Sequence, residues 1–191
     1  MAAASTGRGL LVVVSGPSGV GKGTVVQRLL ERLPGVEASV SFTTRPPRAE
    51  EVEGADYYFV DEERFDELIA EGELLEWASV HQARYGTPRR WVEQKLADGI
   101  DVLLEIDVQG ALQVRGKMAD ALLIFLAPPS REELARRLRL RGTESAEERA
   151  RRLETADSEL AAAPAFDHVL VNDELENCVR TIKNILRTAQ P

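Results

Sequence analysis

The chain has 191 residues, of which 43% are hydrophobic and 29% charged, and its formal net charge at pH 7 is -8. This length predicts one domain with insertions, and the acidic balance argues against binding nucleic acid, which requires a basic face. One cysteine and two histidines exclude an internal disulfide and a Cys/His metal cluster, and they fit a reducing, cytoplasmic setting.

The first segment, residues 1–8, contains no apolar stretch long enough for a signal peptide. No run elsewhere approaches the length needed to cross a membrane. We therefore expect a flexible tail over 1–8, a single domain over 9–188, and no membrane partner.

A strand, a glycine-rich loop and a helix come next. Leu10 to Ser15 is a continuous apolar run typical of a strand buried in a parallel sheet, and residues 24–33 carry apolar side chains at helical spacing. Glycines in the loop let backbone N–H groups face an anion at the helix N-terminus, and Lys22 adds a charge toward the β- and γ-phosphates. The loop therefore predicts an ATP site made of Gly16, Pro17, Ser18, Gly19, Val20, Gly21, Lys22, Gly23 and Thr24.

One position departs from the phosphate-loop pattern G-x-x-x-x-G-K-[ST]. Gly23 stands where a serine or threonine hydroxyl usually ligates the metal, and Thr24 follows it. We therefore expect Mg²⁺, the ion that accompanies ATP, to be held by nucleotide phosphates and water, with no direct protein ligand.

The segment 36–99 alternates less regularly. We expect a strand over 36–42, an exposed loop over 43–55, a strand over 57–60, a helix capped by Asp61 and stopped by Gly72, and a strand over 74–80. Thr87-Pro88 is expected to open a helix that runs to Gly99.

The remaining elements return to an alternating pattern. Apolar strands are expected over 102–107, 121–126 and 166–171, helices with capping boxes at Ser130 and Ser145, and a terminal helix from Leu175. Trp77, Trp91 and Cys178 are expected in the core. Strands and helices that alternate behind a phosphate loop predict a three-layer α/β P-loop fold, with a mostly parallel central sheet and the ligand at the strands' carboxyl ends.

A second group of residues suits a phosphate. Arg45 and Arg48 are guanidinium forks that match phosphate oxygens bidentately, and Tyr57 and Tyr85 supply neutral hydroxyl donors. Together these four side chains predict a site for a nucleoside monophosphate.

The segment from Thr43 to Phe59 resembles the guanylate kinase family. It follows the family's pattern T-[ST]-R-x-[PK]-[RK]-x-[GN]-E-x-[DEN]-G-x-[DEN]-Y-x-F, except that Glu50 stands where the family has Gly or Asn. The resemblance extends over about 9–186 and includes Glu76-Trp77, Tyr85-Gly86-Thr87, the segment 105–110, Arg141-Gly142-Thr143-Glu144 and Val171-Asn172-Asp173.

This resemblance implies ATP-dependent phosphorylation of GMP, and of dGMP, to the diphosphate by direct in-line transfer, as part of purine nucleotide metabolism. The GMP-binding residues it implies, beyond the four phosphate ligands, are Glu51, Asp107, Glu76, Ser41 and Thr87. Glu76 would accept from guanine N1–H and N2–H₂ while the two hydroxyls donate to O6. Adenine reverses this donor pattern, and such mismatches can discriminate by about 10⁴-fold.

The resemblance also divides the domain. It implies a core over 9–42, 88–130 and 156–188, a GMP-binding insertion over 43–87 and a lid over 131–155. Lid residues Arg137, Arg141 and Arg152, with Lys22 and Arg45, would stabilise the transition state, and Asn172 would contact the adenine edge. A solvated helix, with the lid arginines paired to neighbouring glutamates, is the alternative for that segment.

Two acidic residues end the strand expected over 102–107. Asp107 is a candidate for supporting the monophosphate site, and Glu105 for orienting metal-bound water or Lys22. The spacing alone does not separate these roles.

Two alternatives to this function are a non-catalytic binding module and a kinase for another nucleotide. Non-catalytic guanylate-kinase-like modules that bind protein partners typically have degraded phosphate loops, whereas the loop over 16–24 is intact. A P-loop kinase for AMP or dTMP would need an acceptor pocket different from the arrangement between Arg45 and Tyr85.

Overall fold

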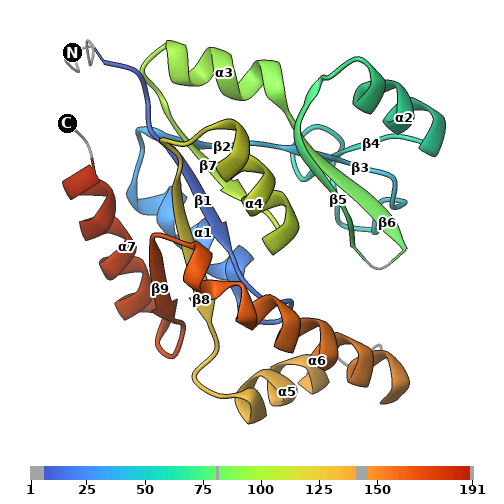
Figure 1. Ribbon diagram of the computed structural model, residues 1–191, viewed down its shortest axis with the longest axis vertical. Coiled ribbons are helices and arrows are strands. Elements are labelled where there is room, and N and C mark those ends of the chain that lie inside the picture. The colour runs from blue at the N-terminus through green and yellow to red at the C-terminus, as the bar shows by residue number, and fades with distance from the viewer. Residues whose placement is uncertain (1–6, 81, 141–145, 190–191) are drawn as a thin grey trace.

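A five-stranded parallel sheet forms the centre of the computed structural model, which describes residues 7–80, 82–140 and 146–189 (Figure 1). The strand order is β2-β7-β1-β8-β9, and all four pairings are parallel. The strands are β1 (Leu11–Ser15), β2 (Val36–Ala38), β7 (Asp101–Glu105), β8 (Leu122–Ala127) and β9 (His168–Val171). The expected parallel α/β fold is therefore confirmed.

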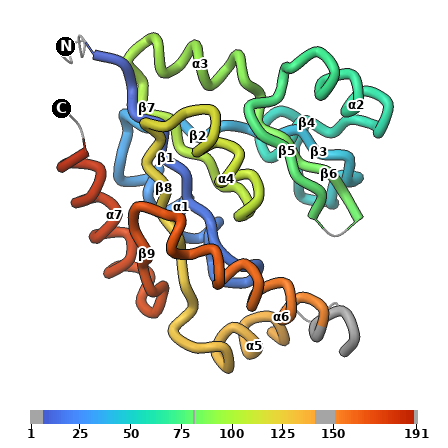
Figure 2. Tube along the Cα trace, in the orientation of Figure 1, coloured from blue at the N-terminus to red at the C-terminus, as the bar shows by residue number. Residues whose placement is uncertain are grey.

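Helices cover both faces of this sheet because successive strand side chains point to opposite sides. On one face, Val12 and Val14 pack against α1 (Lys22–Arg32) and α7 (Leu175–Ala189). On the other face, Val13 packs with residues of α3 (Arg89–Ala97) and α4 (Val108–Lys117). The resulting three layers are visible in Figures 1 and 2.

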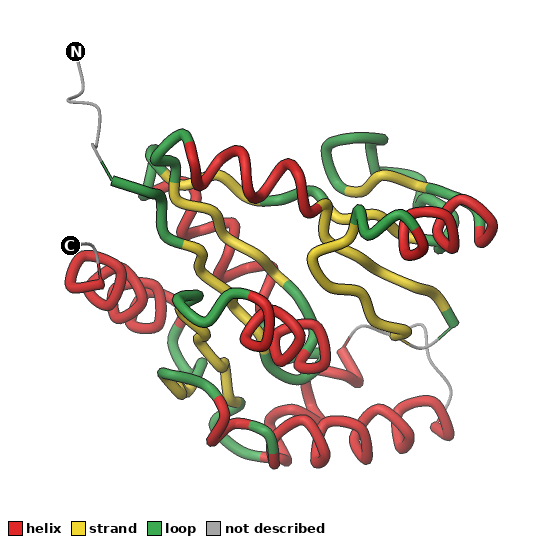
Figure 3. The backbone as a smooth tube through the Cα atoms, turned by 45° about the horizontal axis from the view of Figure 1, so that its top comes forward, coloured by secondary structure: helices red, strands yellow, loops and turns green. Residues whose placement is uncertain are grey.

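A second sheet lies to one side of the first (Figure 3). Its order is β4-β3-β6-β5, formed by β3 (Ser41–Thr43), β4 (Tyr57–Phe59), β5 (Leu74–Val80) and β6 (Ala83–Pro88). Helix α2 (Glu62–Ala70) follows its expected N-cap Asp61, which accepts from the Arg64 N–H at 2.8 Å. Phe65 and Leu68 of α2 pack with Leu74, so this small sheet has a core of its own.

The single strand expected over 36–42 is wrong. Its first part, β2, pairs with β7, and the Ser39 N–H still donates to Leu103 O at 3.2 Å. Its last part, β3, belongs to the small sheet, where Phe42 lies opposite Gly86. The chain therefore passes from one sheet to the other at 39–40, a change that depends on distant strand partners.

Two further expectations need correction. Thr87 does not open a helix, because it pairs with Glu76 inside β6; the helix begins at Arg89 with Pro88 as its N-cap. Trp77 is not in the core: its exposed fraction is 36%, because alternate residues of β5 face solvent. Cys178 is buried and Trp91 packs against the core, as expected. Helix α4 and strand β6 had not been predicted.

Helices α5 (Arg131–Leu140) and α6 (Ala146–Ala161) lie beyond the carboxyl ends of the central strands (Figure 1). They share a small apolar cluster of Leu134, Leu138 and Ala156, and Arg131 forms a two-pronged ion pair with Asp157. The turn η1 (Ala163–Ala165) then leads to β9. The Ser145 cap, Arg141 and most of the expected tail fall outside the described residues. Within the described ranges, none of the helices has the length and apolar character to cross a membrane.

Candidate functional site

The phosphate loop connects β1 to α1 at the carboxyl end of the central sheet. Gly16, Gly19 and Gly21 have φ angles of 140°, 88° and 98°, a region that side-chain-bearing residues rarely adopt. A Cβ atom at Gly16 would lie 2.3 Å from the Leu126 carbonyl oxygen. The loop conformation therefore requires these glycines, and it places the free amides of the α1 N-terminus at the strand ends.

Lys22 lies across this loop. Its Nζ donates to Gly16 O at 2.6 Å and is 3.3 Å from Pro17 O. The first turn of α1 contains no acidic residue, so the positive end of the helix dipole is left for a bound anion. This geometry supports the predicted donor-phosphate role of the loop.

Asn172 and Arg137 meet at the same loop. Asn172 directly follows β9, and its Nδ2 donates to Val20 O at 2.8 Å. Arg137 of α5 donates to Val20 O and to Asn172 O, each at 3.1 Å, and its Nε donates to Glu133. Two residues predicted for ATP binding and transfer thus contact the loop backbone. Arg152 lies on α6 and is partly buried.

Acidic side chains gather beside the loop. The three atoms nearest to a Cβ built at Gly23 belong to the Glu105 carboxylate, at 3.5 Å or more. Asp107 caps α4 by accepting from the Gly110 N–H at 2.8 Å. Burial raises the pKa of Asp107, while that hydrogen bond and the charge of Lys22 act in the opposite direction.

Glu159 of α6 had not been predicted as part of the site. Burial raises its pKa, whereas the charge of Lys22 and the backbone N–H of Ser18 lower it. Glu159 lies outside the predicted lid and matches no motif. Only the fold, which brings it next to the phosphate loop, shows that it belongs to the site.

Mg²⁺ needs oxygen ligands, which carboxylates, nucleotide phosphates and water can supply. Among the described residues, no group of three or more His, Cys, Asp or Glu side chains could hold a metal ion. Mg²⁺ is usually bound through one or two carboxylates together with substrate phosphates and water. The Glu105 carboxylate beside the phosphate loop fits the expected arrangement, in which phosphates and water hold the ion and the carboxylate accepts from its water ligands.

The residues predicted to hold the acceptor phosphate converge in the small sheet and in the loop between its strands β3 and β4. Arg45 donates to both carboxylate oxygens of Glu51 at 2.8 Å, and its Nε is 3.3 Å from the Tyr85 hydroxyl. Its guanidinium also lies over the Tyr57 ring, 5.2 Å from the centroid. The two hydrogen bonds from Arg45 lower the pKa of Glu51 to about 2. Glu51 therefore fixes the Arg45 guanidinium while remaining ionised.

Arg48 is held more loosely. Its backbone N–H donates to Glu51 at 2.8 Å, but its side chain is 75% exposed and its guanidinium lies 3.7 Å from the same carboxylate. The loop thus presents one fixed and one solvent-exposed arginine.

The predicted base pocket contains a buried carboxyl group. Glu76 on β5 is only 3% exposed and faces Thr87 on β6, whose hydroxyl donates to it at 2.6 Å. Burial raises the pKa of Glu76 to about 7, and the negative charge of Asp107 contributes in the same direction. Ser41 lies at the start of β3 in the same sheet.

Gly110 is a further residue of this pocket that the sequence analysis had not assigned a role. A Cβ atom there would lie 2.2 Å from Glu76 Oε2. Its position in the segment 105–110, already matched to the family, was the available signal. The absence of a side chain at Gly110 makes room for the carboxyl group.

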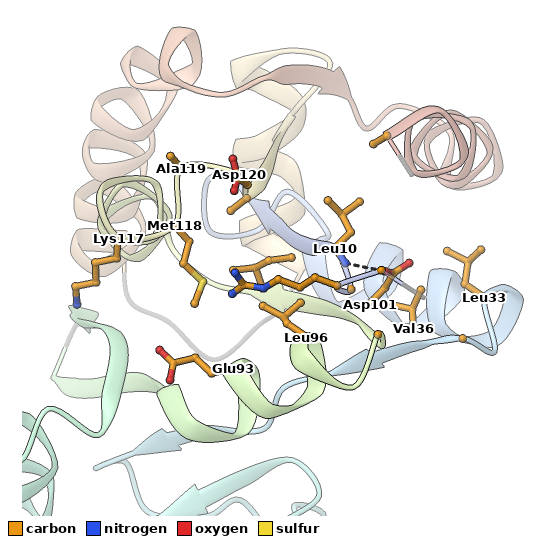
Figure 4. A pocket seen from close by; sticks show the side chains of 18 of the residues that line it. Leu10, Leu33, Val36, Glu93, Leu96, Asp101, Lys117, Met118, Ala119 and Asp120 are labelled. Atoms are coloured by element: carbon orange, nitrogen blue, oxygen red, sulfur yellow. Dashed lines mark hydrogen bonds between the residues drawn. The ribbon is translucent and has the colours of Figure 1, made fainter. Parts of the chain in front are cut away.

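A cavity of about 910 Å³ lies elsewhere, at the amino-terminal edge of the central sheet. Its lining includes Leu10, Leu33, Leu96, Asp101 and Lys117 (Figure 4). None of the predicted site residues that the structure describes lines it. The phosphate loop lies at the opposite edge of this sheet, so the cavity is separate from the predicted site.

The fold and the phosphate loop together define a P-loop nucleotide-binding protein of the three-layer α/β class. A family model described as "Guanylate kinase" matches residues 8–189. The chain therefore belongs to the guanylate kinase family.

Individual relatives agree with this family. The chain is 63% identical over 162 residues to the guanylate kinase of Thermobifida fusca, covering 85% of this chain and 83% of the relative. It is 50% identical over 191 residues to that of Thermosynechococcus vestitus, covering 100% of both. A crystal structure of guanylate kinase from Anaplasma phagocytophilum matches with a TM-score of 0.82 and 39% identity, over 98% of this chain and 89% of that one.

Proposed function

We propose that this protein transfers the γ-phosphoryl group of ATP to GMP, giving ADP and GDP. The observation that carries the proposal is the pairing, in one small sheet, of a buried Glu76–Thr87 hydrogen bond with the arginine cluster at Arg45. The Glu76–Thr87 pair suits the hydrogen-bonding edge of a purine base, and the Arg45 cluster suits the phosphate of the same nucleotide.

Guanine complements this pocket because of its hydrogen-bonding edge. Its N1–H and N2–H₂ groups would donate to Glu76. The Thr87 hydroxyl, whose one proton is donated to Glu76 in the ligand-free protein, would turn and donate to O6 together with the hydroxyl of Ser41. Adenine would place a lone pair against the carboxylate and leave buried groups unpaired. Since nothing in the pocket's motif reads the ribose 2′-hydroxyl, dGMP should also be accepted.

Arg45, Arg48, Tyr57 and Tyr85 would hold the acceptor phosphate so that one of its oxygens attacks the donor in line. Lys22 and the loop amides would hold the β- and γ-phosphates. Mg²⁺, when bound with ATP, would neutralise phosphate charge. Glu105 would orient its water ligands or Lys22, and Asp107 would support the monophosphate site. No covalent intermediate on the protein is required.

The helices α5 and α6 supply the lid of this proposal. Arg137, from its place beside the phosphate loop, and Arg141 and Arg152, as the lid closes and excludes water, would bring positive charge to the transferred group. In this view the segments 43–87 and 131–155 move against a core formed by 9–42, 88–130 and 156–188, and the activity serves purine nucleotide metabolism.

An acceptor panel tests the function. ADP release is measured with ATP, Mg²⁺ and, separately, GMP, dGMP, AMP, UMP or dTMP. We expect turnover with GMP and dGMP, and kcat/KM for AMP lower by about 10³-fold or more. Lys22→Ala should lose turnover but still bind GMP, because Lys22 belongs to the donor side.

Two outcomes would reject the proposal. Equal turnover of AMP and GMP would remove the role of the base pocket. A complete lack of turnover with every acceptor, in protein that still binds GMP, would favour a guanylate-kinase-like binding module.

A further inference from the structure

The carbonyl oxygen of Val20 is held by two donors from different parts of the fold. Asn172 Nδ2 lies 2.8 Å from it and Arg137 Nη1 lies 3.1 Å from it. Asn172 is only 6% exposed, so its amide is fixed by packing. A backbone carbonyl inside the phosphate loop is thus anchored from β9 and from α5.

Anchoring this carbonyl also fixes the next amide. The peptide bonds of the described residues are not cis, and in a trans peptide the C=O and N–H groups point in opposite directions. Donors that hold Val20 C=O therefore direct the Gly21 N–H to the opposite side of this peptide, away from Asn172 and Arg137. Gly21 is the N-cap of α1, so its N–H joins the free amides at the helix N-terminus.

The anchor matters because glycine does not hold such a peptide in place by itself. Gly21 has φ 98° and ψ 26°, and a glycine can rotate its peptide at little steric cost. Asn172 also closes the space around Gly21, where a Cβ would lie 2.9 Å from Nδ2. Without the hydrogen bonds to Val20 O, the Val20–Gly21 peptide should therefore rotate more freely.

The two donors are themselves anchored. The Asn172 N–H donates to Ala127 O at 2.8 Å, at the end of β8, and the Asn172 carbonyl accepts from Arg137 Nη2 at 3.1 Å. The Nε of Arg137 donates to Glu133 at 2.8 Å. Sheet, loop and lid helix meet in this one cluster.

We propose that Asn172 is a positioning residue of the phosphate loop, which with Arg137 orients the Gly21 amide toward the donor's phosphates. This role is separate from contact with the adenine edge, which the family resemblance implies. It rests on the donor half of the proposed function, but it requires no phosphoryl transfer and no acceptor.

Binding of a ligand without a base separates the two roles. Dissociation constants for ADP and for inorganic tripolyphosphate are measured by titration calorimetry for the unmodified protein, Asn172→Ala and Asn172→Asp. We expect the dissociation constants of both ligands to rise by a similar factor, about 10-fold or more, because the loss of a buried hydrogen bond has effects of this size. Asn172→Asp should weaken binding more than Asn172→Ala, because its carboxylate not only lacks a donor for Val20 O but also sets a negative charge against that carbonyl oxygen and the ligand's phosphates. Asp173→Asn, an exposed neighbouring change, is the matched control.

A loss for ADP with unchanged tripolyphosphate binding would overturn the proposal and leave Asn172 as a reader of the base. Unchanged binding of both ligands would overturn it as well. GMP binding reports whether a variant is folded. If these two Asn172 variants do not fold, Asn172→Ser is used instead, and the ¹⁵N–¹H resonance of Gly21 is recorded without ligand. The proposal requires this resonance to shift relative to the unmodified protein. An unshifted resonance refutes the proposal.

Discussion

Glu76 combines a polar function with almost complete burial. A carboxyl group that is 3% exposed loses most of its hydration, and the single hydroxyl of Thr87 replaces only part of it. Its pKa of about 7 in the ligand-free protein shows that the site disfavours the charge. The donors of guanine would supply the missing hydrogen bonds. The Glu76 carboxyl group is therefore placed to bind a ligand and not to stabilise the fold.

This burial predicts a pH-dependent stability. The pKa of Glu76 is raised from 4.5 to about 7, so the folded state binds a proton more tightly than the unfolded state. Stability contributed by this group therefore falls as pH rises from 4.5 through 7. Relative to the unmodified protein, Glu76→Gln should gain about 1–3 kcal/mol in the free energy of unfolding at pH 8 and little at pH 5.

Denaturant unfolding at both pH values measures this difference, with exposed Glu63→Gln as the control. The same variant should lose selectivity for GMP over AMP, because a glutamine presents a different pattern of donors. A stability gain that is equal at pH 5 and pH 8, or selectivity that is fully retained, would contradict the assignment of Glu76.

Residues whose roles depend on local sequence were predictable, whereas those defined by distant contacts were not. Lys22 and the loop glycines follow from spacing alone. Glu51 was known only as part of a motif, and its two-pronged contact with Arg45 needed the structure. Glu159 had no sequence signal, because its partners Ser18 and Lys22 come from the other end of the chain.

At the scale of single elements, α4 contacts residues of both predicted nucleotide subsites. Its N-cap Asp107 lies within the electrostatic influence of Lys22, and its first turn brings Gly110 against Glu76. This helix was not predicted because Gly110 and Gly116 interrupt the apolar pattern of its sequence. The β1–loop–α1 unit was predictable because strand, glycines and amphipathic helix follow in direct succession.

Replacing Gly110 tests the role of α4 in the guanine pocket. Gly110→Ala should raise KM for GMP by about 10-fold or more, because its Cβ would displace the Glu76 carboxyl group. Alanine itself favours a helix interior by about 1 kcal/mol, so global stability should fall little. Steady-state kinetics measure the effect.

The same helix offers a matched control. Gly116→Ala makes the same chemical change, but no atom lies within 4 Å of the added Cβ. An equal KM for GMP in both variants and the unmodified protein would show that Gly110 does not shape the pocket.

At the scale of the whole molecule, the two predicted phosphate sites lie on separate sheets. The chain leaves the central sheet after β2 and returns to its helical layer after β6, and this small sheet has its own apolar cluster. Helix α5 of the predicted lid meets the phosphate loop, since a Cβ at Gly19 would lie 2.7 Å from Leu138 Cδ2. The passage at 39–40 could not be predicted from periodicity, because both halves of 36–42 have strand character and only their partners differ.

This architecture predicts that the two substrates act together on the lid. Hydrogen exchange of α5, α6 and β3–β6 should slow more with ADP, Mg²⁺ and GMP together than the sum of the separate effects, because closure requires both anions. Mass spectrometry of exchanged peptides measures this protection, and Lys22→Ala serves as the control. Strictly additive protection would argue against a shared closure.

The most direct test of the account is a crystal structure of the protein with GMP bound. We expect the phosphate to contact Arg45, Arg48 and Tyr85, and the N1 and N2 atoms of guanine to lie within hydrogen-bonding distance, about 2.7–3.2 Å, of the Glu76 carboxylate. GMP bound elsewhere, or bound with Glu76 and Arg45 turned away from it, would contradict the proposed acceptor site.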